Sequence, residues 1–281
     1  MRQRRIKAAV KTALCRILPL LIRKPLSICI NRQTWLGDTR RFWLSQSILM
    51  DWADKDPIGL HKFLWEHHLG YARTYAIETR FGYDNFNETR QIFFRELREH
   101  LIEAGVNPDT DIDSVFEVGC SLGYLLRYLE TDVFPAAARL EGVDIDRKAV
   151  EEGLAYLHTL GSKVRLTRGD MEDLDDMLEG EIYDIMVCAG TLLYLDYEHA
   201  EALVERMFRH TGVLVALAGL AYEDCDNRDM EASVSRASDC TFIHNIDAMV
   251  ASAGGQVVAR RWEGGKMVDG NTVYFVFARP A

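Results

Sequence analysis

Hydrophobic and polar positions change their spacing once along this chain, near residues 105–113. Before that point, apolar residues recur at helical intervals in residues 60–79 and again in residues 88–104, so both segments are predicted to be helical. Asn87 can cap the second helix and Gly105 can end it. The segment between the two helices is rich in turn-forming and aromatic residues, and we expect a connecting loop there.

After residue 113, short β-branched and apolar runs recur, and we expect strands at residues 114–118, 140–144, 163–167, 183–188, 212–218, 256–262 and 272–278. Helical segments separate the first four runs, at residues 122–130, 147–160 and 171–178. This alternation is typical of a parallel sheet that is covered on both faces. Only residues 263–271 separate the last two runs, so these strands should form an antiparallel hairpin. The predicted fold is α/β, a doubly wound and mostly parallel seven-stranded sheet with an antiparallel last strand, preceded by a helical N-terminal extension.

Charge is distributed unevenly along the chain. Residues 1–32 hold nine Arg and Lys and no acidic residue, although the net charge of the whole chain is -10. The rest of the chain is therefore acidic, which argues against the basic face that a nucleic acid would need, so we expect no DNA or RNA partner. Six scattered cysteines without Cys-x-x-Cys pairs favour reduced thiols in a cytoplasm over a disulfide framework or a zinc site.

The basic N-terminal stretch allows two interpretations. Arg16, Arg23 and Lys24 interrupt its apolar residues, which argues against a transmembrane helix and against a secretory signal. A basic amphipathic segment could rest on an anionic membrane surface, making a cytoplasmic protein peripheral at the membrane. Alternatively, the stretch is a helix that packs on the acidic body. Both interpretations stay open.

A glycine-bearing turn follows the first predicted strand. It contains Gly119 and Gly123 and opens a helix, whose positive end favours a ligand that lies against the backbone. The turn fits the dinucleotide fingerprint G-x-G-x-x-G poorly, because Ser121 occupies the second glycine position and Tyr124 the third.

The turn instead resembles motif I of the class I S-adenosylmethionine-dependent methyltransferases, an acidic-x-Gly-x-Gly-x-Gly loop, with Ser121 as a mild departure. The resemblance spans roughly residues 113–280 and implies the Rossmann-like fold of that family. It implies S-adenosylmethionine as cofactor, held by Glu117, Gly119, Cys120, Ser121 and Gly123.

Further landmarks of the resemblance follow the next three strands in the order of that family. Asp144 is implied to accept hydrogen bonds from the ribose hydroxyls, whereas Asp146 is expected to cap the next helix. Asp170 is implied to hold the adenine amine, and Ile145 and Met171 are implied to pack against the faces of the ring. Ala189 and Gly190 are implied to lie along the methionine end of the donor.

The residues that act on the acceptor are less defined by the sequence. A hydroxyl acceptor needs a base, and the candidates are His244 and Tyr194. His244 lies in a long polar connection, residues 221–245, of the kind that forms substrate loops, but it could equally cap the helix predicted at residues 246–253.

Aromatic and basic residues before the sheet could close over the donor. Tyr75 and Arg80 are the lid candidates, and the alternative is an aromatic stripe buried in the core. His67 and His68 are adjacent on a helix and point in different directions, so we expect no metal site.

These patterns predict a basic amphipathic segment (residues 1–35) and a helical cap or lid (36–110), and the resemblance implies an S-adenosylmethionine-binding methyltransferase domain over residues 111–281. The expected activity is methyl transfer to a small-molecule acceptor or to a saccharide or lipid-linked acceptor, at oxygen. The alternative is a non-catalytic or dinucleotide-binding protein of the same fold.

Overall fold

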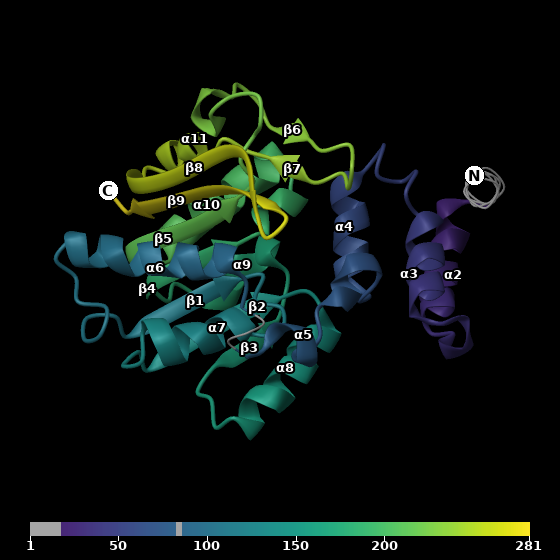
Figure 1. Cartoon of the computed structure of the whole chain (residues 1–281), viewed down its shortest axis with the longest axis horizontal. Coiled ribbons are helices and arrows are strands. Elements are labelled where there is room, and N and C mark those ends of the chain that lie inside the picture. The colour runs from purple at the N-terminus through teal and green to yellow at the C-terminus, as the bar shows by residue number, and fades with distance from the viewer. Residues whose placement is uncertain (1–17, 83–85) are drawn as a thin grey trace. The chain divides into compact units, whose positions relative to one another are not determined.

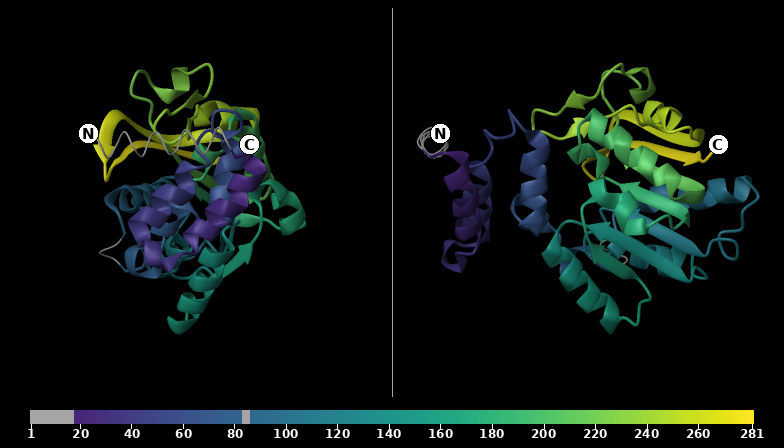
Figure 2. Two further views of the ribbon diagram at one scale, coloured as in Figure 1. Left: turned by 90° about the vertical axis from the view of Figure 1, so that its right-hand side faces the viewer. Right: turned by 180° about the vertical axis from the view of Figure 1, so that it is seen from behind.

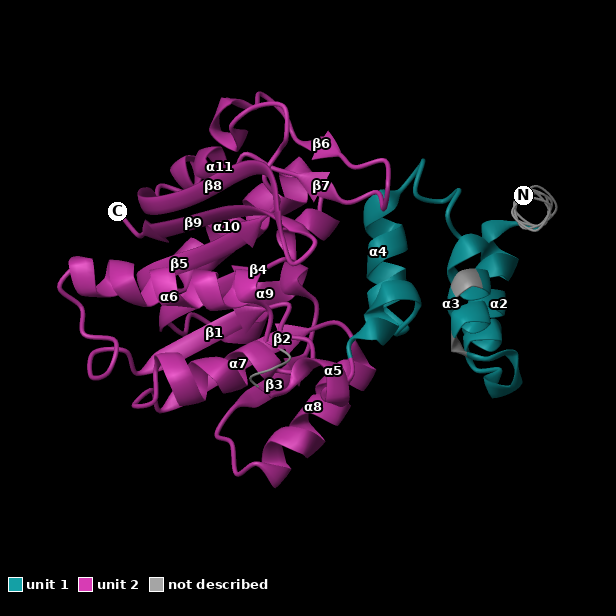
Figure 3. Ribbon diagram, in the orientation of Figure 1, with its two compact units in different colours: residues 1–75 teal, residues 76–281 magenta. Residues whose placement is uncertain are grey.

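The computed structural model describes residues 18–82 and 86–281. Residues 1–17 of the basic stretch and residues 83–85 of the expected loop lie outside the described residues. The chain divides into two compact units, Met1–Tyr75 and Ala76–Ala281 (Figure 3).

The first unit is helical. Its elements are α2 (Leu20–Asn31), η1 (Thr34–Leu36), α3 (Asp38–Ser47), α4 (Pro57–Glu66) and η2 (Gly70–Thr74). The core of this unit contains Leu49, Leu60, Leu64 and Leu69, which are almost completely buried.

The helix expected over residues 60–79 is wrong as a continuous element. His68 and Gly70 adopt left-handed backbone conformations, with φ of 51° and 56°, which a right-handed helix does not accommodate. The segment is therefore split into α4, η2 and the short α5 (Ile77–Arg80), which belongs to the second unit.

The second unit is built on a seven-stranded sheet, as predicted (Figure 1). Its strand order is β3-β2-β1-β4-β5-β9-β8, and the strands are β1 (Ser114–Val118), β2 (Arg139–Asp144), β3 (Arg165–Arg168), β4 (Tyr183–Ala189), β5 (Thr211–Gly219), β8 (Gln256–Val268) and β9 (Asn271–Arg279). The first five strands pair in parallel, and β9 pairs antiparallel with both β5 and β8.

Helices cover both faces of this sheet, so that α6 and α7 lie on one face and α10 and α11 on the other (Figures 1 and 2). The helical elements of the second unit after α5 are α6 (Glu88–Glu103), α7 (Tyr124–Tyr128), η4 (Leu129–Val133), α8 (Arg147–Thr159), η5 (Met171–Asp173), α9 (Leu174–Leu178), η6 (Leu192–Tyr194), α10 (Tyr197–Arg209), η7 (Asn227–Asp229) and α11 (Ile246–Ser252). Asn87 caps α6 by accepting a hydrogen bond from the backbone N–H of Arg90, which confirms the predicted helix start.

The final hairpin is longer than the sequence pattern indicated. Residues 263–271, expected as a connection, mostly continue the two strands, and only Asp269 and Gly270 form the turn. Both turn residues have positive φ, 50° and 79°, which suits the tight turns that join twisted antiparallel strands.

Candidate active site

The candidate site lies where β1 and β4 end side by side in the sheet. The chain leaves β1 toward β2 on one side and leaves β4 toward β5 on the other, so the loops after β1 and β4 diverge. In open α/β sheets such a divergence forms a ligand crevice at the carboxyl ends of the strands. The loop after β1 is the glycine-bearing turn that the sequence singled out.

Two glycines of this turn are required by close contacts within the protein. Gly119 has φ of 78°, and a Cβ atom there would lie 2.1 Å from Oγ1 of Thr191, in the loop after β4. Gly123 has φ of 74° and precedes α7; its Cβ would lie 2.8 Å from Leu166. These contacts keep the backbone of the turn close to the ends of its neighbouring strands.

Ser121 occupies the central position of the turn with an unusual backbone. Its φ of 48° is in the left-handed region that favours glycine, which explains why glycine is the expected residue at this point of the motif. The hydroxyl of Ser121 is buried and has no hydrogen-bond partner among the described residues. Beside it the Cys120 thiol is fully buried, and this burial raises its pKa, so the thiol stays neutral.

Asp144, at the end of β2, connects the turn to the second strand. Its carboxylate accepts hydrogen bonds from the backbone N–H groups of Ser121 and Asp146, both at 2.8 Å. Burial nevertheless raises the pKa of Asp144 to about 6. Backbone N–H groups occupy part of the carboxylate's lone pairs, and a remaining lone pair could accept a ligand hydroxyl. Asp146 caps α8 through the N–H of Ala149, as the sequence predicted.

Glu117 and Arg90 form the charged end of the site, near β4. Glu117 is fully buried, one of its carboxyl oxygens has no hydrogen-bond partner among the described residues, and burial raises its pKa to about 8. The positive charge of Arg90, from α6, opposes that rise. Nη2 of Arg90 donates to the carbonyl of Ala189 at 3.0 Å, and a Cβ on Gly190 would lie 2.9 Å from the same nitrogen.

Arg90 was not among the residues that the sequence singled out. No local pattern distinguishes it from other arginines on a polar helix, because its partners lie 99 residues away in the chain. Its nearness to Ala189, Gly190 and Glu117 makes it a candidate ligand for an anionic group.

The residues that the resemblance implied for binding the adenine ring lie in the loops after β2 and β3. Asp170 begins η5 by accepting a hydrogen bond from the backbone N–H of Glu172 at 3.1 Å. Ile145 and Met171 are half-buried. The roles implied for Asp170, Ile145 and Met171 in holding an adenine stay predictions.

His244 is positioned by two hydrogen bonds rather than by a helix end. Its Nε2 lies 3.1 Å from the carbonyl of Leu192, and its Nδ1 lies 2.6 Å from Oγ of Ser233. A carbonyl only accepts, so Nε2 carries the proton and Nδ1 receives the hydroxyl hydrogen of Ser233. Burial lowers the pKa of His244, opposed by the Leu192 and Leu195 carbonyls and the charge of Asp196.

The alternative that His244 caps the following helix is wrong. Asn245 is the capping residue of α11, because its side-chain oxygen accepts a hydrogen bond from the N–H of Ala248 at 3.0 Å. Sequence reasoning missed both Asn245 and Ser233. Asparagine is a preferred capping residue and could have been recognised from the sequence, whereas no sequence signal links Ser233 to His244.

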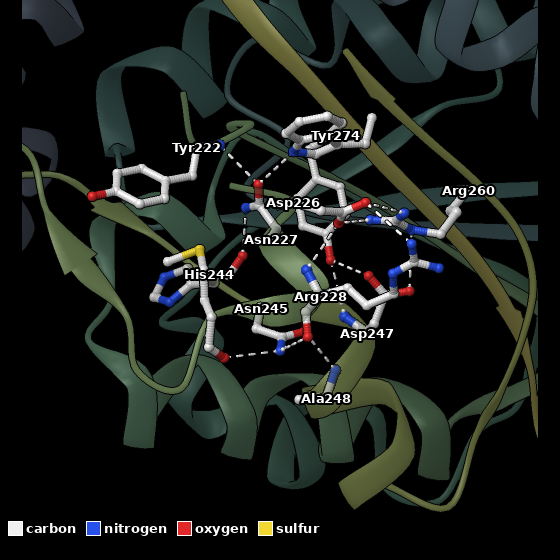
Figure 4. A network of polar contacts seen from close by, with 12 residues as sticks. Tyr222, Asp226, Asn227, Arg228, His244, Asn245, Asp247, Ala248, Arg260 and Tyr274 are labelled. Atoms are coloured by element: carbon white, nitrogen blue, oxygen red, sulfur yellow. Dashed lines mark hydrogen bonds and ion pairs between the residues drawn. The ribbon is translucent and has the colours of Figure 1, made fainter. Parts of the chain in front are cut away.

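A network of polar side chains holds the connection that carries His244 against the sheet (Figure 4). The fully buried Asn227 donates to the carbonyls of Leu220 and His244 at 3.0 Å and 2.7 Å. Arg260, on β8, donates through both terminal nitrogens to the carboxylate of Asp226. The connection also contains the short antiparallel strands β6 (Val234–Ser235) and β7 (Phe242–Ile243).

The other sequence candidates lie in both units. Tyr194 is half-buried in η6, directly after Leu192 and Leu193. Tyr75 belongs to the first unit, where its ring contacts Trp65 edge-on at 5.3 Å. Arg80 belongs to the second unit, with its guanidinium 5.9 Å from the centre of the Tyr124 ring. Closure of Tyr75 and Arg80 over a donor stays a prediction.

Within residues 18–82 and 86–281, no group of three or more His, Cys, Asp or Glu side chains could hold a metal ion. The same residues contain no helix with the length and apolar character that crossing a membrane requires.

The part of the chain that carries most of the site is similar to a known family. A family model described as a methyltransferase domain matches residues 115–212, which include the glycine-bearing turn, Asp144 and the end of β4. No curated protein matches the chain.

Solved structures share the fold at low sequence identity. One is an S-adenosylmethionine-dependent methyltransferase from Clostridium acetobutylicum ATCC 824, with 12% identity and a TM-score of 0.51, covering 68% of this chain and 92% of its own. Another is the magnesium protoporphyrin IX methyltransferase from Synechocystis PCC 6803 with bound SAH, with 15% identity and a TM-score of 0.51, covering 84% of this chain and 100% of its own.

Proposed function

Because this chain is a class I S-adenosylmethionine-dependent methyltransferase, we propose that its acceptor is a hydroxyl oxygen of a small molecule or of a saccharide or lipid-linked compound. The observation that carries the proposal is the hydrogen bond between Ser233 and His244, next to the carbonyl of Leu192. A hydroxyl acceptor must lose its proton, and this pair provides a place for it.

The donor site comprises residues from the carboxyl ends of four strands. Asp144 would bind the ribose hydroxyls and Asp170 the adenine amine, with Ile145 and Met171 against the ring. At the other end the backbone of Gly119 and Gly190 would lie along the amino-acid portion, and the Ser121 hydroxyl is a spare hydrogen-bonding group within the turn.

The charged groups near β4 suit the amino-acid portion of the donor. Arg90 would bind its carboxylate, and Glu117 would face its ammonium group. An ammonium near Glu117 would favour the ionised carboxylate, whose pKa burial raises to about 8 in the free protein. Tyr75 and Arg80 remain the proposed lid residues. When bound, S-adenosylmethionine supplies a methyl group activated by its sulfonium.

The proton of the acceptor would leave through Ser233. His244 is only 3% exposed and cannot easily meet an acceptor directly, whereas Ser233 is half-buried. We assign Ser233 to contact the acceptor hydroxyl, pass its own hydrogen to Nδ1 of His244 and receive the acceptor proton. Because its pKa lies below the ordinary value, His244 is neutral near pH 7 and its Nδ1 can accept this proton.

The imidazolium formed in this step would be stabilised by its surroundings. The carbonyls of Leu192 and Leu195 and the negative charge of Asp196 all favour the protonated ring. Tyr194, from the same turn as Leu192, is the second candidate to orient an acceptor. The acidic body of the chain argues for a neutral or cationic acceptor surface rather than a nucleic acid.

The experiment is transfer of a labelled methyl group from S-adenosylmethionine to soluble hydroxyl and amine compounds and to extracted lipid-linked saccharides. Variants Ser233→Ala and His244→Gln should lower kcat by at least about a hundredfold, which is the lower end of the range for general base catalysis. They should also lose the rise of kcat with pH that titration of His244 produces. Ser235→Ala, two residues after Ser233 and exposed, is the matched control.

The possible outcomes test the role of the base and the class of acceptor separately. Unchanged kcat and an unchanged pH profile in both variants would contradict the role of Ser233 and His244. Methylation of amines alone, with no oxygen product, would contradict the acceptor class.

A further inference from the structure

Helix α2 of the first unit buries polar side chains and exposes apolar ones, the reverse of an ordinary surface helix. Its buried positions are Arg23 and Ser27, whereas Leu21 is 84% exposed and Ile22 is 49% exposed. A surface helix normally buries its apolar side and exposes its charges.

An ion pair fixes this orientation. The guanidinium of Arg23 donates to both carboxylate oxygens of Asp51 and, at 2.7 Å, to the backbone carbonyl of Ile48. Ser27 satisfies its hydroxyl within the helix by donating to the carbonyl of Lys24 at 2.8 Å. Rotation of α2 to bury its apolar side would keep the bond of Ser27 but would break those of Arg23 to Ile48 and Asp51, leaving the Asp51 carboxylate without its cation.

The outer side of α2 forms a continuous apolar strip. Leu21, Pro25 and Cys29 follow one another at intervals of four residues, all exposed, and Ile22 flanks them. Trp35, in the 3-10 helix after α2, is 79% exposed, and its indole N–H donates to the side chain of Gln33 at 3.1 Å. We call Leu21, Ile22, Pro25, Cys29 and Trp35 the α2 face.

We propose that the α2 face lies on an anionic lipid surface, parallel to the membrane plane. The α2 face would be the surface that makes the membrane contact suggested by the basic N-terminal stretch. This contact does not depend on which acceptor is methylated. Residues 1–32 carry nine cations and no anion, and all of these cations except Arg23, which is buried and paired with Asp51, complement anionic headgroups while the apolar strip enters the acyl boundary.

The charge pattern favours lipid over a second copy of this chain. A two-fold symmetric contact through the α2 face would bring two uniformly basic stretches together, and like charges at such a contact repel. An exposed tryptophan also suits the membrane interface, where its ring is apolar and its N–H stays hydrogen-bonded.

Vesicle co-sedimentation of the full chain tests the proposal. Binding to vesicles of phosphatidylcholine with phosphatidylglycerol should exceed binding to phosphatidylcholine alone and should weaken as salt increases. Leu21→Glu and Trp35→Glu, singly and together, should reduce binding at least tenfold, which corresponds to about 1.4 kcal/mol. The matched control is Met267→Glu on β8, where an apolar residue that is 59% exposed lies outside the α2 face.

Lipid quenching gives a second readout. Brominated lipids in the anionic vesicles should quench the tryptophan fluorescence of the chain, and Trp35→Phe should remove most of that quenching. Circular dichroism and S-adenosylhomocysteine binding of every variant confirm that the fold and the donor site are intact.

Three results would overturn the proposal. They are unchanged vesicle binding in the Leu21 and Trp35 variants, absence of binding by the unmodified chain, and a concentration-dependent dimer that Leu21→Glu abolishes. Methyl transfer to a soluble acceptor is measured separately, so loss of vesicle binding with full transfer leaves the proposed chemistry untouched.

Discussion

Gly119 and Thr191 approach so closely that a Cβ atom on Gly119 would lie 2.1 Å from Oγ1 of Thr191. Through this contact the turn after β1 meets the loop after β4. The backbone of both segments can therefore lie along one ligand.

Gly119→Ala should destabilise the protein strongly. Its positive φ alone costs about 1–2 kcal/mol for a residue with a side chain, and the clash with Thr191 adds to it. Gly161→Ala is the control, because Gly161 also has positive φ but no atom within 4 Å of a Cβ there. Urea unfolding should show a larger loss of free energy for Gly119→Ala, partly restored by Thr191→Ala. Equal losses at both glycines would contradict the packing argument.

Ser121→Gly should be tolerated. The change relieves a left-handed serine and removes a buried hydroxyl without a partner among the described residues, while the N–H that donates to Asp144 remains. We expect unchanged or higher thermal stability and S-adenosylhomocysteine affinity within about threefold, less than 1 kcal/mol. A large loss of affinity would instead show that the Ser121 hydroxyl binds the donor.

Titration of Glu117 should lower the free energy of unfolding as pH rises. Because burial raises its folded pKa to about 8, the folded state holds a proton that the unfolded state releases near the ordinary value of 4.5. The stabilisation is complete below 4.5 and is lost as pH rises through about 8. Asp144 adds a smaller loss that ends near pH 6.

Glu117→Gln checks this sign. The amide stays neutral, so the melting temperature of the variant relative to the unmodified protein should increase between about pH 5 and pH 9. Scanning fluorimetry across that range measures the difference. Parallel melting curves at every pH would show that Glu117 does not titrate as described.

Asn227→Ala should loosen the connection that carries His244. The substitution leaves the carbonyls of Leu220 and His244 and the indole N–H of Trp262 without their partner. Unsatisfied buried groups cost about 1–3 kcal/mol each before water compensates, so we expect a loss of several kcal/mol and a lower kcat. Asn271→Ala, at an exposed asparagine, should change neither. A fully active, equally stable Asn227→Ala would contradict the role of the network.

The sheet was predictable because its strands are short apolar runs. The predicted strand starting at Ser114 has the observed bounds, and the other parallel strands differ from the structure by one or two residues at most ends. Local backbone conformation was harder to anticipate. The left-handed His68 broke a helix that the apolar spacing favoured, and the turn at Asp269 and Gly270 extended two strands into an expected loop.

The residues of the candidate site also divide into those that the sequence could predict and those that it could not. Residues at strand ends, such as Asp144, follow from their place in the pattern and from the resemblance to motif I. Arg90 could not be found in this way, because its partner Ala189 lies 99 residues away in the chain. Ser233 lies only 11 residues from His244, but no sequence pattern predicts that these two side chains meet. Nothing in the periodicity of α6 indicates which of its arginines faces β4.

Titration calorimetry with S-adenosylmethionine, S-adenosylhomocysteine and NAD tests the donor site most directly. The unmodified chain and the exposed-acid control Asp132→Ala should bind both adenosyl ligands and not NAD. Asp144→Ala and Asp144→Asn should weaken adenosyl binding at least tenfold, or about 1.4 kcal/mol, while remaining folded by circular dichroism. Unchanged adenosyl binding by both Asp144 variants, or NAD binding without adenosyl binding, would contradict the account of this site.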